Sequence, residues 1–438
     1  MIIILVLFYI LFPILLIYWT QKSTFINKVG AVVLAYGFGL LIGNIGIFPA
    51  TSDVYHGLLE GKAALPSAKA EDLFSQGIIT SSDLYSNQIS SIQDMLLTFT
   101  IPLAIPLLLF SLDLRRWLRL AKKTFISLIL ALVSVVVVVY GGFFIFRDSI
   151  EHIDMVGGMI IGIYSGGTPN VASIAAGLGV LENNQELFIM TNTYDMVIGA
   201  TCLLLLITVG QRIIGLVLPP FRIPEVTAED VDVNAVTTDI DDYSGMFRRA
   251  TILDLFKALG IAIGIFIIGA IMGGLAQMVL SGQTFMQALF NPHMAVLILV
   301  ITSLGLAVSL IPKINKLTKT FQFGMYLIIL FCLVMASMAN LRDMFQIDYL
   351  NLFLYIFMVV YGSLVVHVLL SIPFKVDTDT MIISSTALVY SPPFVPVVAS
   401  ALKNKDVIIS GLTIGILGYV LGNFLGIGTG KLLASFMP

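Results

Sequence analysis

The sequence predicts an all-α polytopic membrane protein with about ten transmembrane helices and two re-entrant hairpins, arranged as two inverted repeats. Hydrophobic residues make up 58% of the 438 residues and charged residues only 11%, whereas soluble domains average roughly 45–50% apolar residues. Apolar runs of about 20 residues, the length that spans a bilayer as a helix, recur along the chain. Two further apolar stretches are interrupted by glycine or proline, which indicates broken helices.

Ten uninterrupted apolar segments are predicted to cross the membrane. The first begins at the N-terminus without an early Lys or Arg and lacks a small-residue cleavage site, so we expect a retained helix rather than a signal peptide. The predicted spans are 2–19, 29–49, 91–112, 124–146, 186–210, 251–280, 293–311, 322–341, 349–372 and 406–433.

The two interrupted segments, 155–180 and 379–402, are predicted to be hairpins. They are broken by SGGTPN (165–170) and SPPFVP (391–396). Motifs recur at one offset, because PNVAS (169–173) returns as PVVAS (396–400) 227 residues later, as does DLR (113–115) as NLR (340–342). This duplication divides the chain into an N-terminal repeat (1–210), an acidic linker (211–250) and a C-terminal repeat (251–438).

The distribution of Lys and Arg decides whether the broken segments cross the membrane. If both are re-entrant hairpins, most basic residues fall on one side, as the positive-inside rule expects of the cytoplasmic side. If both cross, the basic residues divide almost evenly. The hairpin arrangement gives each repeat five crossings, which makes the repeats inverted. It places the linker in the cytoplasm and both termini outside, in a multi-pass protein of a bacterial inner membrane and its lipid bilayer.

Several function classes are disfavoured by what the sequence lacks. No basic stripe accompanies the net charge of −3, so no nucleic-acid partner is expected. Cys202 and Cys332 lie in apolar runs, which indicates neither a disulfide framework nor a metal centre. HExxH, GxSxG and Walker motifs are absent, so we expect a non-enzyme that uses neither ATP nor an organic cofactor.

The two breaks are the first candidates for a binding site. Non-helical backbone at membrane depth is tolerated only inside protein or beside a water-filled cavity, and opened helix ends bind anions at N–H groups and cations at carbonyls. The alternative is that the glycine pair merely allows close helix packing. The predicted substrate-binding residues are Ser165, Gly166, Gly167, Thr168, Asn170, Ser391, Pro392 and Pro393.

Asp195 is the leading candidate for ion coupling, because a carboxylate well inside a span is costly and marks a functional site. It binds either a proton or Na⁺, and the candidate Na⁺ ligands are Thr168, Asn170 and Asp195. Asn192 and Thr193 belong to the same polar run. The structural alternative is a carboxyl group fixed by Asn192 or Tyr194.

Two residues of the C-terminal repeat have alternative interpretations. Asn423 occupies nearly the position that Asp195 has in the first repeat, so it is either a neutral counterpart at the ion-coupling site or an interhelical hydrogen-bonding residue. His367 lies toward the cytoplasmic end of its span, where a packing role is the simpler interpretation and a proton relay the alternative.

IPLAIPLLLF (101–110), GGTPN (166–170) and the glycine-rich run from Gly418 to Phe424 carry a resemblance to a known family. With these motifs the sequence resembles the YjcL-like membrane proteins of unknown function over essentially the whole chain. Thr168 stands where that family usually has serine, and Pro392 and Pro393 replace an expected glycine pair.

More distantly, the plan of two halves, each with a hairpin between its fourth and fifth spans, is similar to the sodium-coupled glutamate and 2-hydroxycarboxylate symporters. This similarity implies alternating access by an elevator-like or rocking motion, and a homodimer. We predict a secondary active transporter that couples Na⁺ or H⁺ to a small organic anion, an amino acid or a short peptide such as a cell-wall fragment. A passive channel is the first alternative, and an intramembrane enzyme is the second.

Overall fold

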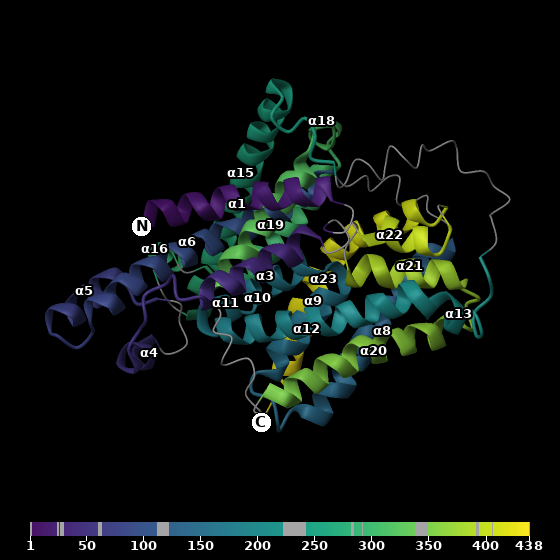
Figure 1. Ribbon diagram of the computed structural model, residues 1–438, viewed down its shortest axis with the longest axis horizontal. Helices are drawn as coiled ribbons and strands as arrows, with labels where there is room; N and C mark the ends of the chain where they lie inside the picture. The colour runs from purple at the N-terminus through teal and green to yellow at the C-terminus, as the bar shows by residue number, and fades with distance from the viewer. Residues whose placement is uncertain are drawn as a thin grey trace.

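The computed structural model describes residues 2–23, 26, 30–59, 64–111, 122–221, 242–281, 284–290, 292–338, 349–390, 394–404 and 406–437. Across these residues the chain is helical and contains no strand. Most long helices run along the long axis of the molecule, while α15 projects from the bundle (Figure 1). The DLR and NLR motifs and positions 222–241 of the predicted linker lie outside the described residues.

Within the described ranges, eight helices are long and apolar enough to cross a membrane. Seven are continuous α-helices, and the eighth consists of α12, the π-helix η1 (Leu206–Gly210) and α13 (Gln211–Ile214). These helices confirm an all-α polytopic membrane protein. They are α1 (Ile2–Lys22), α6 (Ser81–Phe110), α8 (Lys122–Phe146), α12 (Gln185–Leu205), α15 (Arg249–Ser281), α19 (Thr320–Ser337), α20 (Leu350–Ser371) and α23 (Ile408–Ala434).

Two predicted spans, 29–49 and 293–311, form shorter helices than expected: α3 (Ala31–Asn44) and α17 (Met294–Ser309). With 14 residues, α3 is only about 21 Å long. Its glycines bring it very close to α19, because a Cβ at Gly43 would lie 2.4 Å from the Ser337 carbonyl oxygen. By contrast, α6 begins ten residues before its predicted span, where a capping box of Thr80 and Asp83 starts the helix.

Short helices connect the long ones. The segment between α3 and α6 holds α4 (Asp53–Leu59) and α5 (Ser67–Ser75), which project from one end of the bundle (Figure 1). A small core of Tyr55, Leu65, Ala70 and Ile79 holds this region together. The remaining connectors are α11 (Val180–Asn183), α16 (Phe285–Phe290) and α18 (Pro312–Asn315).

Each interrupted segment forms two helices: α9 (Ile153–Gly166) with α10 (Thr168–Gly177), and α21 (Thr378–Val389) with α22 (Val395–Ala401). Corresponding helices of the two predicted repeats pack against one another: α6 with α19, α8 with α20, and α9 with α21. A two-fold relation between the halves stays a prediction. Nearly all residues of α9, α10 and α21 are buried.

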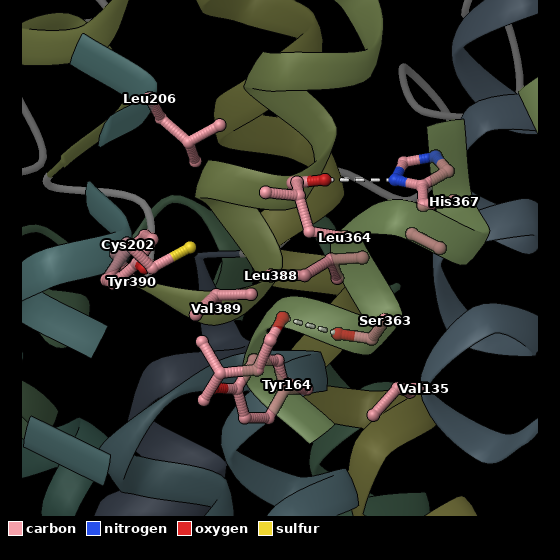
Figure 2. A pocket seen from close by; sticks show the side chains of 13 residues that line it. Val135, Tyr164, Cys202, Leu206, Ser363, Leu364, His367, Leu388, Val389 and Tyr390 are labelled. Atoms are coloured by element: carbon pink, nitrogen blue, oxygen red, sulfur yellow. Dashed lines mark hydrogen bonds between the residues drawn. The ribbon is translucent and has the colours of Figure 1, made fainter. Parts of the chain in front are cut away.

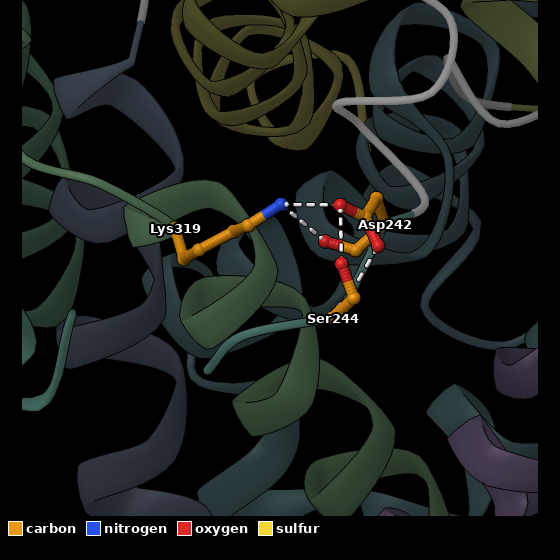
Figure 3. A network of polar contacts seen from close by, with 3 residues as sticks. All are labelled: Asp242, Ser244 and Lys319. Atoms are coloured by element: carbon orange, nitrogen blue, oxygen red, sulfur yellow. Dashed lines mark hydrogen bonds and ion pairs between the residues drawn. The ribbon is translucent and has the colours of Figure 1, made fainter. Parts of the chain in front are cut away.

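The end of the linker that leads into α15 is held to the start of α19 by Asp242. Lys319 Nζ lies 3.0 Å from Asp242 Oδ2 and donates to the Asp242 carbonyl at 2.7 Å, and Ser244 donates twice to the same carboxylate at 2.8 Å (Figure 3). Burial raises the pKa of Asp242, but the hydrogen bonds from Ser244 and Lys319 outweigh it and hold the pKa below its usual range.

Candidate functional site

The first broken segment folds back on itself at Gly167. This residue has φ 66° and ψ −154°, a conformation that glycine adopts without a Cβ clash, and Pro169 then suits the first turn of α10. A Cβ on Gly162 of α9 would lie 3.2 Å from the backbone nitrogen of Val171 in α10, and one on Gly158 would lie 2.9 Å from Leu178. Because α10 returns along α9, the segment is a helical hairpin.

The second broken segment also returns along its own path. Asp379, near the start of α21, accepts a hydrogen bond of 2.8 Å from the side chain of Asn404, which lies just beyond α22. The same carboxylate accepts another from Gln211 at 2.9 Å. The predicted binding residues Ser391, Pro392 and Pro393 lie outside the described residues. Their neighbours Tyr390 and Phe394 represent the tip of this hairpin.

One cavity of about 460 Å³ lies where the two hairpin tips approach each other. Gly167, Thr168 and Pro169 reach it from the first hairpin, and Tyr390 and Phe394 from the second. The remaining walls come from α12, the end of α1, the start of α3, α19 and Tyr243 of the linker. Apart from Asp195, the described residues that line the cavity are uncharged, and most of them are apolar.

Asp195 is partly buried on the α12 wall of the cavity. Its Oδ1 accepts a hydrogen bond of 3.2 Å from the Tyr164 hydroxyl of α9. Tyr390, which immediately precedes the second break, donates to the Gly199 carbonyl at 2.9 Å, one helical turn along α12. The two tyrosines that precede the breaks therefore hold the same face of α12, one turn apart. Tyr194 instead packs its ring against Phe353.

Asn192 also lines the cavity, three residues before Asp195. Its side chain is 2% exposed, and its Nδ2 has no hydrogen-bond partner within the described part of the chain. An unsatisfied buried amide is costly and unusual in a protein. Asn192 therefore offers the cavity a hydrogen-bond donor next to a carboxyl group. Thr193 points elsewhere, because its hydroxyl bonds to Ile189 and Tyr36.

Three of the predicted binding residues of the first break do not line the cavity. Ser165 is fully buried and donates to the Ile161 carbonyl at 2.6 Å, and Asn170 donates to the Gly418 carbonyl of α23 at 2.8 Å. Gly166 packs against Asn170 and Tyr419. The predicted Na⁺ ligands Thr168 and Asp195 share the cavity, whereas the Asn170 amide is directed to α23.

Asn423 lies on a different side of the hairpin from Asp195. Its Nδ2 donates to Thr302 Oγ1 of α17 at 3.0 Å, and it is not among the residues that line the cavity. Of the two interpretations of Asn423, the structure shows the interhelical hydrogen bond. Its Oδ1 has no partner in the described ranges.

A row of glycines on α23 forms the seat of the first hairpin, a role that the sequence analysis did not assign. A Cβ on Gly418 would lie 1.7 Å from the Ser165 carbonyl oxygen, and one on Gly422 would lie 2.0 Å from the Ser165 hydroxyl. A Cβ on Gly426 would likewise clash with the Ile174 side chain of α10. The spacing of four residues was the available signal, because small residues at i and i+4 allow membrane helices to approach closely.

Tyr164 and Tyr390 are the other functional candidates that the sequence analysis did not single out. Their signal was the repeat itself, since each is the tyrosine directly before a break, in Tyr-Ser-Gly-Gly and Tyr-Ser-Pro-Pro. The candidate site thus consists of Asp195, its partner Tyr164, the Asn192 amide, the tip of the first hairpin, and Tyr390 and Phe394 of the second.

Comparison with known proteins places the chain among multi-pass membrane proteins. Residues 72–436 match the family described as "Protein of unknown function (DUF819)". The chain is also 25% identical over 424 residues to the "Uncharacterized membrane protein YjcL" of Bacillus subtilis (strain 168), covering 95% of this chain and 93% of the relative. Because the family match covers most of the sequence, the chain belongs to the DUF819 family of membrane proteins.

Proposed function

We propose that this protein is a secondary active transporter that couples a cation gradient to the movement of a small organic anion, an amino acid or a short peptide. The observation that carries the proposal is one cavity lined by Gly167 and Thr168 of the first hairpin, by Tyr390 and Phe394 of the second, and by Asp195. Helix ends opened at mid-membrane, together with an intramembrane carboxylate, are how secondary transporters bind solute and coupling ion.

The cavity suits a solute that is largely apolar with a few polar groups. Its volume, about 460 Å³, falls within the range of roughly 300–1,000 Å³ typical of small-molecule sites. The Asn192 amide and the Thr168 hydroxyl offer hydrogen-bond donors to a carboxylate, and Asp195 offers an acceptor to an ammonium group or a cation. This pairing of donor and acceptor favours a solute that carries both a carboxylate and an ammonium group, such as an amino acid or a short peptide.

The cavity walls also indicate which side is open. The end of α1, the start of α3 and Tyr243 of the linker line the cavity, and the charge distribution assigns these segments to the cytoplasmic side. We therefore assign this conformation to the inward-facing state of an alternating-access cycle. The outward-facing state requires a movement of the hairpins relative to α12.

A binding screen is the first test. Purified protein is heated with glutamate, lactate and citrate as organic anions, and with a casein hydrolysate as a source of amino acids and short peptides, with and without Na⁺. A bound solute raises the melting temperature by mass action. Asp195→Asn is expected to abolish the rise in melting temperature that the solute causes. Asp94→Asn, the same change outside the cavity, is expected to leave this rise unaltered.

Uptake into proteoliposomes is the decisive test. A transporter accumulates solute when a Na⁺ or H⁺ gradient is imposed, and Asp195→Asn reduces accumulation to the level of protein-free liposomes. Solute accumulation by Asp195→Asn equal to the wild type would remove Asp195 from the mechanism. Unsaturable flux that no gradient concentrates would identify a channel instead.

A further inference from the structure

A second, smaller cavity of about 30 Å³ adjoins the first. Val389 and Tyr390 line both cavities. In Figure 2, Tyr390 and Cys202 lie on one side of the small cavity and His367 on the other, with Tyr164 nearby. A buried water needs about 10–15 Å³ of such space and two to four polar partners, so this cavity is large enough for one or two waters.

His367 of α20 is the most polar group of the small cavity. It is 1% exposed, and both ring nitrogens have hydroxyl partners: Ser385 Oγ lies 2.9 Å from Nδ1 and Ser127 Oγ lies 3.3 Å from Nε2. A neutral imidazole donates at one nitrogen and accepts at the other. The two hydroxyl groups complete this pattern, so protons can pass through the ring from one side to the other.

Tyr164 connects His367 to the candidate site. Its ring lines the small cavity, and its hydroxyl donates to Asp195, which lines the large cavity. The two cavities are therefore joined through one hydroxyl group that contacts the coupling carboxylate. The small cavity lies between Tyr164 and His367, because both residues line it.

A second observation extends the polar path away from the site. Ser371 lies one helical turn after His367 on α20, is fully buried, and its Oγ has no hydrogen-bond partner within the described ranges. On the facing helix α8, Thr124 lies one turn before Ser127 and donates to Ser410 at 3.5 Å. These hydroxyls lead toward the ends of α8 and α20 that the charge distribution places at the cytoplasm.

Among the described residues, no fixed charge pairs with His367. The small cavity is lined by residues of α8, α9, α12, η1, α20 and α21 and by Tyr390. The titratable groups among the lining residues, besides His367, are Tyr164, Cys202 and Tyr390, and the carboxylate of Asp195 lies beyond Tyr164. His367 is thus not one half of a structural ion pair, and its hydroxyl partners point to proton transfer instead.

We propose that His367 relays protons between Asp195 and the cytoplasmic end of α8 and α20, along a route separate from the solute cavity. The inference rests on the proposed transport function and makes the proton its coupling ion. A proton leaving Asp195 enters the Tyr164 hydroxyl as the Tyr164 proton passes to water. The water then protonates the Ser385 hydroxyl as Ser385 passes its own proton to Nδ1 of His367, and Nε2 releases its proton to the Ser127 hydroxyl, which passes its own proton on, so the ring begins and ends neutral.

The test measures proton entry and solute uptake in the same proteoliposomes. Vesicles are loaded with the pH dye pyranine, and the casein hydrolysate with glutamate, lactate and citrate is added outside, at an imposed pH or Na⁺ gradient. The wild type is expected to acidify the lumen as solute enters. His367→Gln is expected to lower both rates by about 100-fold, the scale of losing a positioned proton-transfer group, while the solute-induced rise in melting temperature remains.

Two further variants make the result specific. Tyr164→Phe removes one hydroxyl from the route and is expected to act in the same direction, which keeps the test valid if His367→Gln folds poorly. Ser134→Ala is the control, because the Ser134 hydroxyl is buried on α8 but bonds to the Leu130 carbonyl of its own helix. Ser134→Ala is expected to retain wild-type proton entry.

The outcomes separate the relay from the transport function. Wild-type proton entry in His367→Gln and Tyr164→Phe would overturn the relay. Uptake driven by a Na⁺ gradient without acidification would also overturn the relay but would leave the transporter standing. Absence of uptake by the wild type under every gradient would overturn the proposed function, and the relay with it.

Discussion

The two hairpins are held in opposite ways. The first is fixed at its tip, where Ser165 and Asn170 are buried against the glycine row of α23 and Asn170 bonds to Gly418. The second is fixed at its base, where Asp379 accepts hydrogen bonds from Asn404 and Gln211. Two segments that share a sequence motif have therefore acquired different anchors.

This difference assigns different mechanical roles to the hairpins. A tip packed backbone to backbone cannot move without its partner helix, because close-packed interfaces shift between discrete arrangements rather than deform continuously. The second hairpin presents Tyr390 and Phe394 to the cavity and contacts the start of α3 through Phe394 and Gly30. We expect the second hairpin to be the moving gate and the first to be part of a rigid body with α23.

The largest effect is expected where the first hairpin meets α23. Gly418→Ala places a Cβ 1.7 Å from a backbone oxygen, so the hairpin must separate from α23 at a cost of about 3 kcal/mol or more. Thermal unfolding in detergent measures the loss. Gly428→Ala is the matched control on the same helix, because a Cβ there meets nothing within 4 Å. Equal stability of the two variants would contradict the claim that the glycine row of α23 holds the first hairpin.

Asn170→Ala is expected to have the next largest effect. It removes the buried bond to Gly418 and leaves that carbonyl without its amide partner, which costs about 1–3 kcal/mol of the free energy of unfolding. The same unfolding measurement checks this value. Because the site is at a hairpin tip, solute-dependent stabilisation should also weaken. An Asn170→Ala protein as stable as the wild type would show that the tip is not an anchor.

Asn404→Ala tests the base of the second hairpin and should cost less, about 1 kcal/mol, because the Asn404 bond to Asp379 is only partly buried. Its more specific effect should be faster amide hydrogen exchange in α22 (Val395–Ala401) with α10 unchanged, measured by mass spectrometry. Faster exchange in both hairpins would contradict independent anchoring.

The structure accounts for what the sequence could and could not predict. Apolar length and the positions of the breaks predict helices and hairpins, because both depend on local residues and membrane thickness. Which face of each break meets the cavity depends on contacts far apart in sequence. Ser165 and Asn170 are the most polar residues of the first break, yet α23 occupies that side and leaves Gly167 and Thr168 to the cavity. Asp195 was predictable from its charge alone, while its partner Tyr164 needed the fold.

The smallest effect is expected at the ion pair between Lys319 and Asp242, which joins the linker to the start of α19. Lys319→Met removes the partly exposed pair with Asp242, worth about 0.5 kcal/mol. The pKa of Asp242 is lower in the folded protein than in the unfolded chain, where it is about 3.9. The ion pair therefore stabilises the protein fully above the unfolded pKa, and this stabilisation is lost as the pH falls through the folded pKa. Melting temperatures of both proteins between pH 3 and pH 7 should therefore converge at the acidic end. A difference in melting temperature that stays the same at every pH would show that the ion pair does not contribute to stability.

The glycine seat also sets the order in which the chain can be assembled. Asn170 and the Gly418 carbonyl are 248 residues apart, so α23 leaves the ribosome well after the first hairpin. At about 5–20 residues per second, roughly 12–50 s pass between synthesis of the first hairpin and arrival of its seat. During that interval the polar Ser165 to Asn170 turn has no final partner, so biogenesis must shelter it in the insertion machinery or at the membrane surface.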